Sequence, residues 1–193
     1  MANGFFALLS RMRFIARWGL MRSSIPENVQ EHSHETAVYA HALGLIRREV
    51  FQKPCDAERL AVLALYHDAS ETLTGDLPTP VKYYDRRIRT AYKDVERRAE
   101  EKLLTLLPEE LRKAYAPVLT PAAEDAELWL LVKAADKLSA YIKCMEELKA
   151  GNNEFREAAA QTKRALEAYD MPEVRYFMDT FMDSFTLTLD ELK

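Results

Sequence analysis

Apolar residues recur every three or four positions along most of this chain, a spacing that predicts helices. The first apolar stripe predicts a helix that begins near Phe5, carries Arg17 and Trp18 at its end, and stops at Gly19. The same spacing predicts further helices over 31–51, 57–70, 88–106, 123–150, 154–169 and 173–183, with a short one that begins at Pro108. The helix over 57–70 is dense in alanine and leucine, so we expect it to be central and buried.

One internal segment interrupts the helical pattern. Residues 71–82 contain Gly75, Pro78 and Pro80, and a continuous helix cannot run through them. The two-residue alternation typical of strands is confined to 185–189. The sequence therefore predicts an all-α fold, and its 193 residues suit a single domain over 1–193.

Composition narrows the class of protein. Hydrophobic residues make up 48% and charged residues 30% of the chain. These fractions are typical of a soluble globular domain, and the net charge of −4 argues against a general nucleic-acid binder. Cys55 and Cys144 form no CxxC motif or disulfide framework, which fits a reducing compartment. No apolar run approaches a membrane span, and the apolar start is too short for a signal peptide. We therefore expect a cytoplasmic protein.

The four histidines are the first candidates for chemistry. His32, His34 and His41 lie in the segment EHSHETAVYAH, and His67 stands alone. Side chains two positions apart on a helix point about 200° apart, so His32 and His34 cannot bind one ion together. From the residues alone, either His32 or the pair His34 and His41 is the functional set.

Carboxylates accompany the isolated histidine. Asp68 follows His67 where an apolar helix is predicted to end, and a negative charge there is unfavourable unless a cation offsets it. If the helix continues, Glu71 leans to the same side as both. Asp136 lies inside the apolar run LWLLVKAADKLSAYIKCM, where it is either exposed or, if buried, paired or metal-bound. Together with His32, these residues would form a metal site of two histidines and two carboxylates.

Two further groups flank this set. Asp76 follows Glu71 within the Gly/Pro segment, and two such carboxylates suit activation of water and orientation of a substrate. Arg17 and Trp18 combine a planar fork for phosphate with a large stacking surface. Each group also has a purely structural interpretation. Asp76 would then cap a turn, and Arg17 and Trp18 would mark a helix end with the tryptophan in the core.

These residues, in this order, carry a resemblance. His32, His67-Asp68 and Asp136 resemble the H…HD…D signature of HD-domain metal-dependent phosphohydrolases. The segments RWGLMR, ENVQEHS, YHDASETLTGDLPTPVKY and KCMEELKAGNNEF resemble the bacterial YfbR-type 5′-deoxynucleotidases, from about residue 5 to the C-terminus. The resemblance implies an all-α HD-domain helical bundle with a metal site between its central helices.

The resemblance also implies roles. The metal, cobalt or manganese in this family, would bind His32, His67, Asp68 and Asp136. Glu71 would be the catalytic carboxylate, aided by Arg17, which orients the phosphate, and by Asp76. The implied substrate-binding residues are Arg17, Trp18, His32, Asp68, Asp76, Leu77, Pro78, Thr79 and Asp136. The substrate would be a deoxyribonucleoside 5′-monophosphate, without a nucleic-acid polymer or a membrane, and the enzyme would be a homodimer.

The expected reaction is metal-assisted hydrolysis of a phosphomonoester to a deoxyribonucleoside and phosphate, in which Glu71 positions or deprotonates water. Trp18 and the segment 76–79 would exclude ribose sterically, since an apolar pocket alone rejects an added hydroxyl poorly. One alternative is another HD-type phosphohydrolase, acting on nucleoside triphosphates or cyclic nucleotides; triphosphates would require more cations than Arg17. Another is a non-catalytic metal- or nucleotide-binding protein, which would not need Glu71 and Asp76. A mixed histidine and carboxylate set suits Mn, Fe, Co or Zn.

Overall fold

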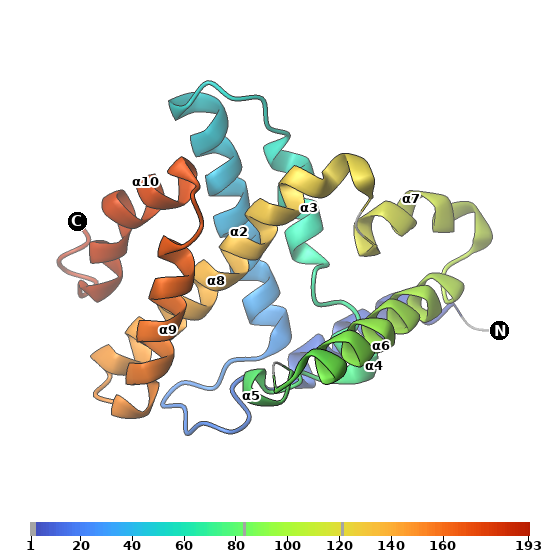
Figure 1. Cartoon of the computed structure of the whole chain (residues 1–193), viewed down its shortest axis with the longest axis horizontal. Coiled ribbons are helices and arrows are strands. Elements are labelled where there is room, and N and C mark those ends of the chain that lie inside the picture. Colours follow the sequence, from blue (N-terminus) through green and yellow to red (C-terminus); the bar gives the residue numbers. More distant parts are fainter. Residues whose placement is uncertain (1–2, 83, 121) are drawn as a thin grey trace.

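The computed structural model describes residues 3–82, 84–120 and 122–193, and these ranges fold into helices without a β-strand (Figure 1). The α-helices are α1 (Phe5–Leu9), α2 (Val29–Leu45), α3 (Ala57–Leu65), α4 (Glu71–Thr74), α5 (Thr79–Lys82), α6 (Arg86–Thr105), α7 (Glu109–Leu119), α8 (Ala126–Lys149), α9 (Arg156–Glu167) and α10 (Pro172–Phe181). The predicted all-α fold is confirmed. The alternating residues 185–189 form no strand, because a 3₁₀ turn occupies Met182–Thr186.

Three helices build the main core. In Figure 1, α8 crosses α2 and α3, and leucines from all three are fully buried between them, among them Leu43, Leu60 and Leu138. Asn28 and Glu31 cap the start of α2 reciprocally, which satisfies backbone N–H groups of its first turn. Gly44 permits the close approach of α2 and α3, since a Cβ atom there would lie 2.9 Å from the Cβ of Ala57.

The predicted helix over 57–70 ends earlier than expected. Helix α3 ends at Leu65, and a series of turns carries His67 and Asp68 before α4 begins at Glu71. Gly75 then adopts a φ of 71°, a left-handed conformation that costs glycine little, and ends α4. The helix does not continue to Glu71, so the expected shared helical face of His67, Asp68 and Glu71 is wrong: the turn carries the first two and α4 carries Glu71.

The N-terminal helix is also shorter than predicted. Helix α1 and a 3₁₀ turn end at Phe14, and the chain then runs antiparallel to residues 27–29 through a bridge between Ala16 and Asn28. In this stretch the positive φ belongs to Trp18, at 59°, and the helical turn has already ended at Phe14. The expectation that Gly19 stops a helix is therefore wrong. Arg17 and Trp18 thus follow a short bridged segment and face Glu27.

Hydrogen bonds hold the loop over residues 19–26, which joins Trp18 to Glu27, against α8. The fully buried Glu147 accepts hydrogen bonds from the backbone N–H of Ser24 at 2.7 Å and of Ile25 at 3.1 Å. Lys143, also buried, donates to Glu147 at 2.6 Å and to the carbonyl of Ile25, while Asn152 donates to Glu147 at 2.8 Å. A buried ion pair therefore fixes this loop to the central helix.

The predicted boundaries elsewhere are close to those observed. The charged helix α6 packs its apolar stripe onto Phe5 of α1 and onto Leu119 of α7. Pro108 precedes the first turn of α7 as its cap, one position earlier than predicted, and Gly151 with φ of 84° follows α8 as expected. Among the described residues, none of the helices combines the length and the hydrophobicity that a transmembrane span requires.

Candidate metal centre and active site

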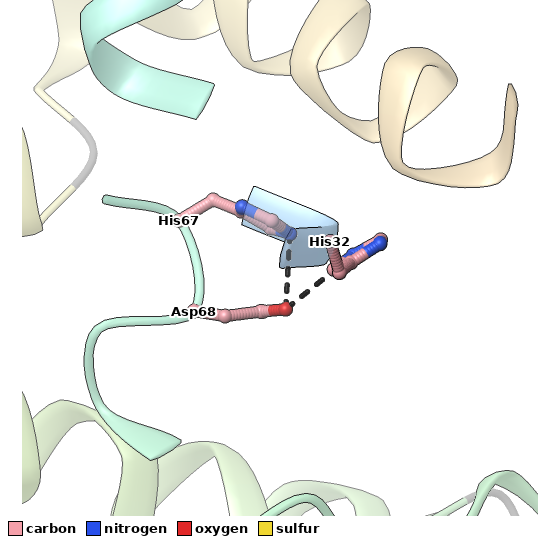
Figure 2. Close-up of side chains that lie close together, drawn as sticks. All are labelled: His32, His67 and Asp68. Atoms are coloured by element: carbon pink, nitrogen blue, oxygen red, sulfur yellow. Dashed lines mark ion pairs between the residues drawn. The ribbon is translucent and has the colours of Figure 1, made fainter. Parts of the chain in front are cut away.

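The structure brings the two histidines and two aspartates together at the crossing of α2 and α8. His32 comes from α2, and His67 and Asp68 come from the turn after α3; Figure 2 shows Asp68 paired with both rings. The Oδ2 of Asp68 lies 3.1 Å from the Nε2 of His67 and 3.6 Å from the Nε2 of His32. Asp136 of α8 places its Oδ1 3.2 Å from the same nitrogen of His32.

The orientation of the histidine rings suits metal binding. Nδ1 of His67 donates to the carbonyl of Ala64 at 2.7 Å, so its Nε2 is directed inward. That nitrogen is buried near Asp68 and makes no hydrogen bond of regular geometry among the described residues. Ligand atoms of His32, His67 and Asp68 lie within 4.8 Å of one another. A buried imidazole nitrogen of this kind beside carboxylates fits a divalent transition metal.

A second set of contacts fixes the ring of His32. Its Nδ1 lies 3.0 Å from the Oγ of Ser139, and that hydroxyl donates to Glu35 at 3.1 Å. Because the serine proton is directed at the carboxylate, its oxygen accepts from Nδ1. In the neutral ring this leaves the lone pair on Nε2, the nitrogen that faces Asp136 and Asp68 and would bind a cation. Such outer contacts commonly set the tautomer of a metal ligand.

The imidazoles and carboxylates of this cluster shift one another's pKa values. Burial alone would lower the pKa of His67, but the facing Asp68 raises it above its ordinary value. Burial would raise the pKa of Asp68, but the imidazoles of His67 and His32 hold it well below its usual range. Burial and Arg17 lower the pKa of His32. Lys137, 3.2 Å from Asp136, and the imidazole of His32 likewise hold the pKa of Asp136 well below its usual range against the effect of burial. Both aspartates therefore remain ionised, and a divalent cation would add to the positive charge that Arg17 and Lys137 already place beside them.

Arg17 and Trp18 lie beside the cluster. Nη1 of Arg17 is 3.6 Å from the Oδ2 of Asp68, so its guanidinium borders the proposed metal position. The Trp18 ring packs edge-on against Phe155, with 5.2 Å between ring centroids. One oxygen of Glu27 accepts from both residues of the pair, and sequence analysis gave Glu27 no role.

Glu71 and Asp76 complete the acidic side of the site. Glu71 is 6% exposed, and its Oε2 is buried without a hydrogen-bond partner in the described part of the chain. Burial, together with the charges of Asp68 and Asp76, raises the pKa of Glu71 to about 10. Burial also raises the pKa of the half-buried Asp76. A buried carboxyl with an unpartnered oxygen and a pKa shifted by neighbouring charges is a candidate for proton transfer.

A cleft of about 540 Å³ opens next to Arg17 and Trp18. Its other walls are the loop before α5 and the exposed sides of α8 and α9. Besides the Arg-Trp pair, it is lined by Gly19, Leu20, Met21, Asp76, Pro78, Thr79, Pro80, Lys137, Ala140, Glu154, Glu157, Ala158, Gln161, Thr162 and Ala165. Leu77, the remaining member of the predicted substrate edge, is half-buried and is not among these residues.

Burial distinguishes the histidines that the sequence left open. His32 is fully buried in the cluster, whereas His34 is exposed and His41 is half-buried on α2. Sequence analysis missed Ser139 and Glu35 as partners of His32. A weak signal existed for Ser139, which follows Asp136 by three positions and therefore shares its helical face.

Comparison with known proteins matches the chain to one protein family. The family model for 5′-deoxynucleotidase YfbR-like proteins matches residues 4–185. A 5′-deoxynucleotidase of Photobacterium profundum is 50% identical over 188 residues, which cover 97% of each chain. The 5′-deoxynucleotidase YfbR of Escherichia coli is 52% identical and covers 97% of this chain and 94% of its own.

Solved structures share the fold. An HD-domain phosphohydrolase from Listeria innocua superposes with a TM-score of 0.81 at 24% identity, over 95% of this chain and 88% of its own. The HD phosphohydrolase DatZ of cyanophage S-2L, solved with dA and one catalytic Zn²⁺, superposes with a TM-score of 0.62 at 24% identity, over 94% and 96%. The predicted HD-domain bundle is confirmed.

Proposed function

The chain belongs to the YfbR-like 5′-deoxynucleotidase family, and we propose that it hydrolyses deoxyribonucleoside 5′-monophosphates to a deoxyribonucleoside and inorganic phosphate. The observation that carries this proposal is the convergence of His32, His67 and Asp68 beside Arg17 at the edge of a cleft. Relatives at 50–52% identity carry the name 5′-deoxynucleotidase, and a neighbour in fold was solved with dA and Zn²⁺.

The site suits a divalent metal ion, and we propose His32, His67, Asp68 and Asp136 as the residues that hold it. Cobalt and manganese are the proposed metals on the resemblance to the family, and a set of imidazole and carboxylate ligands is compatible with both. When bound, such an ion stabilises negative charge on phosphate and makes water more acidic.

Three side chains supply the other functions that the reaction needs. Arg17 binds and orients the phosphate, since its guanidinium already borders Asp68. Glu71 positions the attacking water and, when ionised, accepts its proton. Burial and the charges of Asp68 and Asp76 oppose the ionised form, and the cations Arg17 and Lys82 favour it. Asp76 orients the substrate from the cleft wall.

The sugar would lie between Trp18 and the segment that contains Leu77, Pro78 and Thr79. A flat indole held on one side and a proline-containing segment on the other leave little room to adjust, so an added 2′-hydroxyl is excluded by shape. This arrangement favours deoxyribonucleotides over ribonucleotides.

We further propose a homodimer of single-domain subunits that works in the cytoplasm. Cys55 and Cys144 are both free, as expected of a protein from a reducing compartment. Light scattering at micromolar concentration measures the mass: about twice the 22.2 kDa of one chain supports the dimer.

Phosphate release from dAMP and from AMP tests the function. Protein stripped of metal and resupplied with Co²⁺ or Mn²⁺ should release phosphate faster from dAMP, and stripped protein should not. Asp68→Ala and Glu71→Gln should each abolish release, while His34→Ala, which alters an exposed histidine outside the cluster, should leave it unchanged. Hydrolysis of nucleoside triphosphates or cyclic nucleotides alone would replace this proposal with another phosphohydrolase activity. No hydrolysis of any phosphoester would indicate a non-catalytic binding protein.

A further inference from the structure

Glu27 contacts both residues that border the phosphate and sugar positions. Its backbone carbonyl accepts from the N–H of Arg17 at 3.0 Å, which places its side chain directly against the Arg-Trp pair. A single oxygen, Oε2, then accepts from Nε of Arg17 at 3.0 Å and from Nε1 of Trp18 at 2.7 Å. The side chains of Glu27 and Arg17 are only 8% and 13% exposed, so solvent competes little for these bonds.

The Trp18 indole needs this support. Its backbone φ of 59° is uncommon for a residue other than glycine. Such a conformation costs about 1–3 kcal/mol, so surrounding contacts must hold it. Phe155 contacts the ring edge-on, and the indole N–H, which needs a partner when buried, finds it in Glu27. The bond to Glu27 therefore fixes which direction the indole plane faces.

The same oxygen restricts Arg17. With Nε bound to Glu27, the rotation of the guanidinium is set and Nη1 is directed toward Asp68, at 3.6 Å. A carboxylate that holds Nε leaves the terminal nitrogens of arginine available to a second anion. Movement of Glu27 would thus displace both the guanidinium of Arg17, which binds the phosphate in the proposed function, and the indole of Trp18, which contacts the sugar.

We propose that Glu27 is a positioning residue that couples phosphate orientation by Arg17 to the exclusion of ribose by Trp18, an inference that rests on the proposed function. Glu27 touches neither the metal ligands nor the substrate in this scheme; it acts through the pair. The preference for deoxyribonucleotides then depends on the position of the side-chain acceptor oxygen of Glu27 and not on its negative charge.

Three substitutions separate reach from charge. Glu27→Gln keeps an acceptor oxygen at the same reach and removes the charge, Glu27→Asp keeps the charge and withdraws it by one methylene, and Glu27→Ala removes both. Glu31→Ala is the matched control, because it deletes an exposed carboxylate four residues away whose hydrogen bond is to the cap of α2. The quantity measured is kcat/KM for dAMP divided by kcat/KM for AMP.

The aspartate and alanine variants should lower this ratio at least about tenfold, equivalent to about 1.4 kcal/mol, while the glutamine variant stays within about threefold of wild type. Glu31→Ala should not change the ratio. Loss of selectivity in Glu27→Gln with selectivity retained in Glu27→Asp would overturn the inference, since charge would then be decisive. An equal fall on both substrates in Glu27→Ala would also overturn it. If the alanine variant does not fold, the aspartate and glutamine variants decide.

A measurement without substrate keeps this inference separate from the proposed function. In ¹⁵N-tryptophan-labelled protein, Trp18→Phe assigns the indole N–H signal of Trp18 against that of Trp129. Hydrogen exchange at that indole should accelerate at least about tenfold in Glu27→Asp and Glu27→Ala relative to wild type, and unchanged exchange would overturn the inference. Absence of turnover in wild type would instead refute the proposed function and leave the exchange result valid.

Discussion

Replacing Glu147 by alanine tests how the loop over 19–26, beside the Arg-Trp pair, is held in place. Glu147 is 0% exposed and accepts from two backbone N–H groups of this loop, from Lys143 at 2.6 Å and from Asn152 at 2.8 Å. The substitution leaves Lys143 buried without its counterion. Removing one partner of a buried ion pair costs about 3–5 kcal/mol. At about 2–4 °C per kcal/mol for a chain of this size, the melting temperature should fall by about 6–20 °C.

The assay is urea unfolding followed by circular dichroism, repeated across pH. Burial alone would raise the pKa of Glu147, but the hydrogen bonds from Lys143, Asn152 and the loop hold it well below its usual range. Its folded-state pKa is therefore depressed below the unfolded value of about 4.3. The stabilisation is complete above that value and is lost as the pH falls toward the folded-state pKa. The difference in unfolding free energy between wild type and variant should be constant near neutral pH and shrink below about pH 4.3.

Glu167→Ala provides the matched control. Glu167 pairs with Lys163 on the surface of α9 at 4.0 Å. An exposed pair of this kind on a helix contributes about 0.5 kcal/mol or less. The reasoning is refuted if Glu147→Ala costs less than about 1 kcal/mol at pH 7, where about 3–5 kcal/mol is expected, or if its effect is the same at pH 7 and below pH 4.

Three further changes have defined outcomes. Ser139→Ala removes the hydroxyl that orients His32, so calorimetric titration with Mn²⁺ should show about 10- to 100-fold weaker binding; unchanged affinity would remove Ser139 from the site. Trp18→Ala should reduce the preference for dAMP over AMP more than it reduces turnover of dAMP, and an equal loss on both would argue against the sugar wall. Gly44→Ala should lower the free energy of unfolding by up to about 2 kcal/mol, because overpacking against Ala57 costs about 1–3 kcal/mol and a helix-propensity gain offsets about 1 kcal/mol of it. Greater stability in this variant would show that α2 and α3 can separate.

Much of the fold was predictable because it depends on local periodicity. The apolar stripe of α6 and the long run of α8 specify their helices to within three residues at each end, and Gly151 marks an end that its positive φ confirms. The early end of α3 was not predictable in this way. Tyr66 is a tolerable helix residue, and the turn after it is stabilised by the bond from His67 to the carbonyl of Ala64.

The candidate site was predictable where residue type alone is unusual, as at His67, Asp68 and Asp136. It was not predictable where the relation is through space. His32 and His34 differ in burial and not in local sequence, so periodicity could not choose between them. Glu27 likewise gives no local signal, because its role depends on a chain reversal that brings it against Arg17 and Trp18.

The proposed metal ligands come from three elements that are distant in sequence: α2, the turn after α3, and α8. An ion that joins them binds the native chain and not the unfolded one, so metal supply and conformational stability become a single linked equilibrium. At a free concentration about one hundred times the dissociation constant, the ion adds about 2.7 kcal/mol. Starvation for the metal would then shorten the lifetime of the protein against proteolysis, and cellular abundance would follow the metal along with activity.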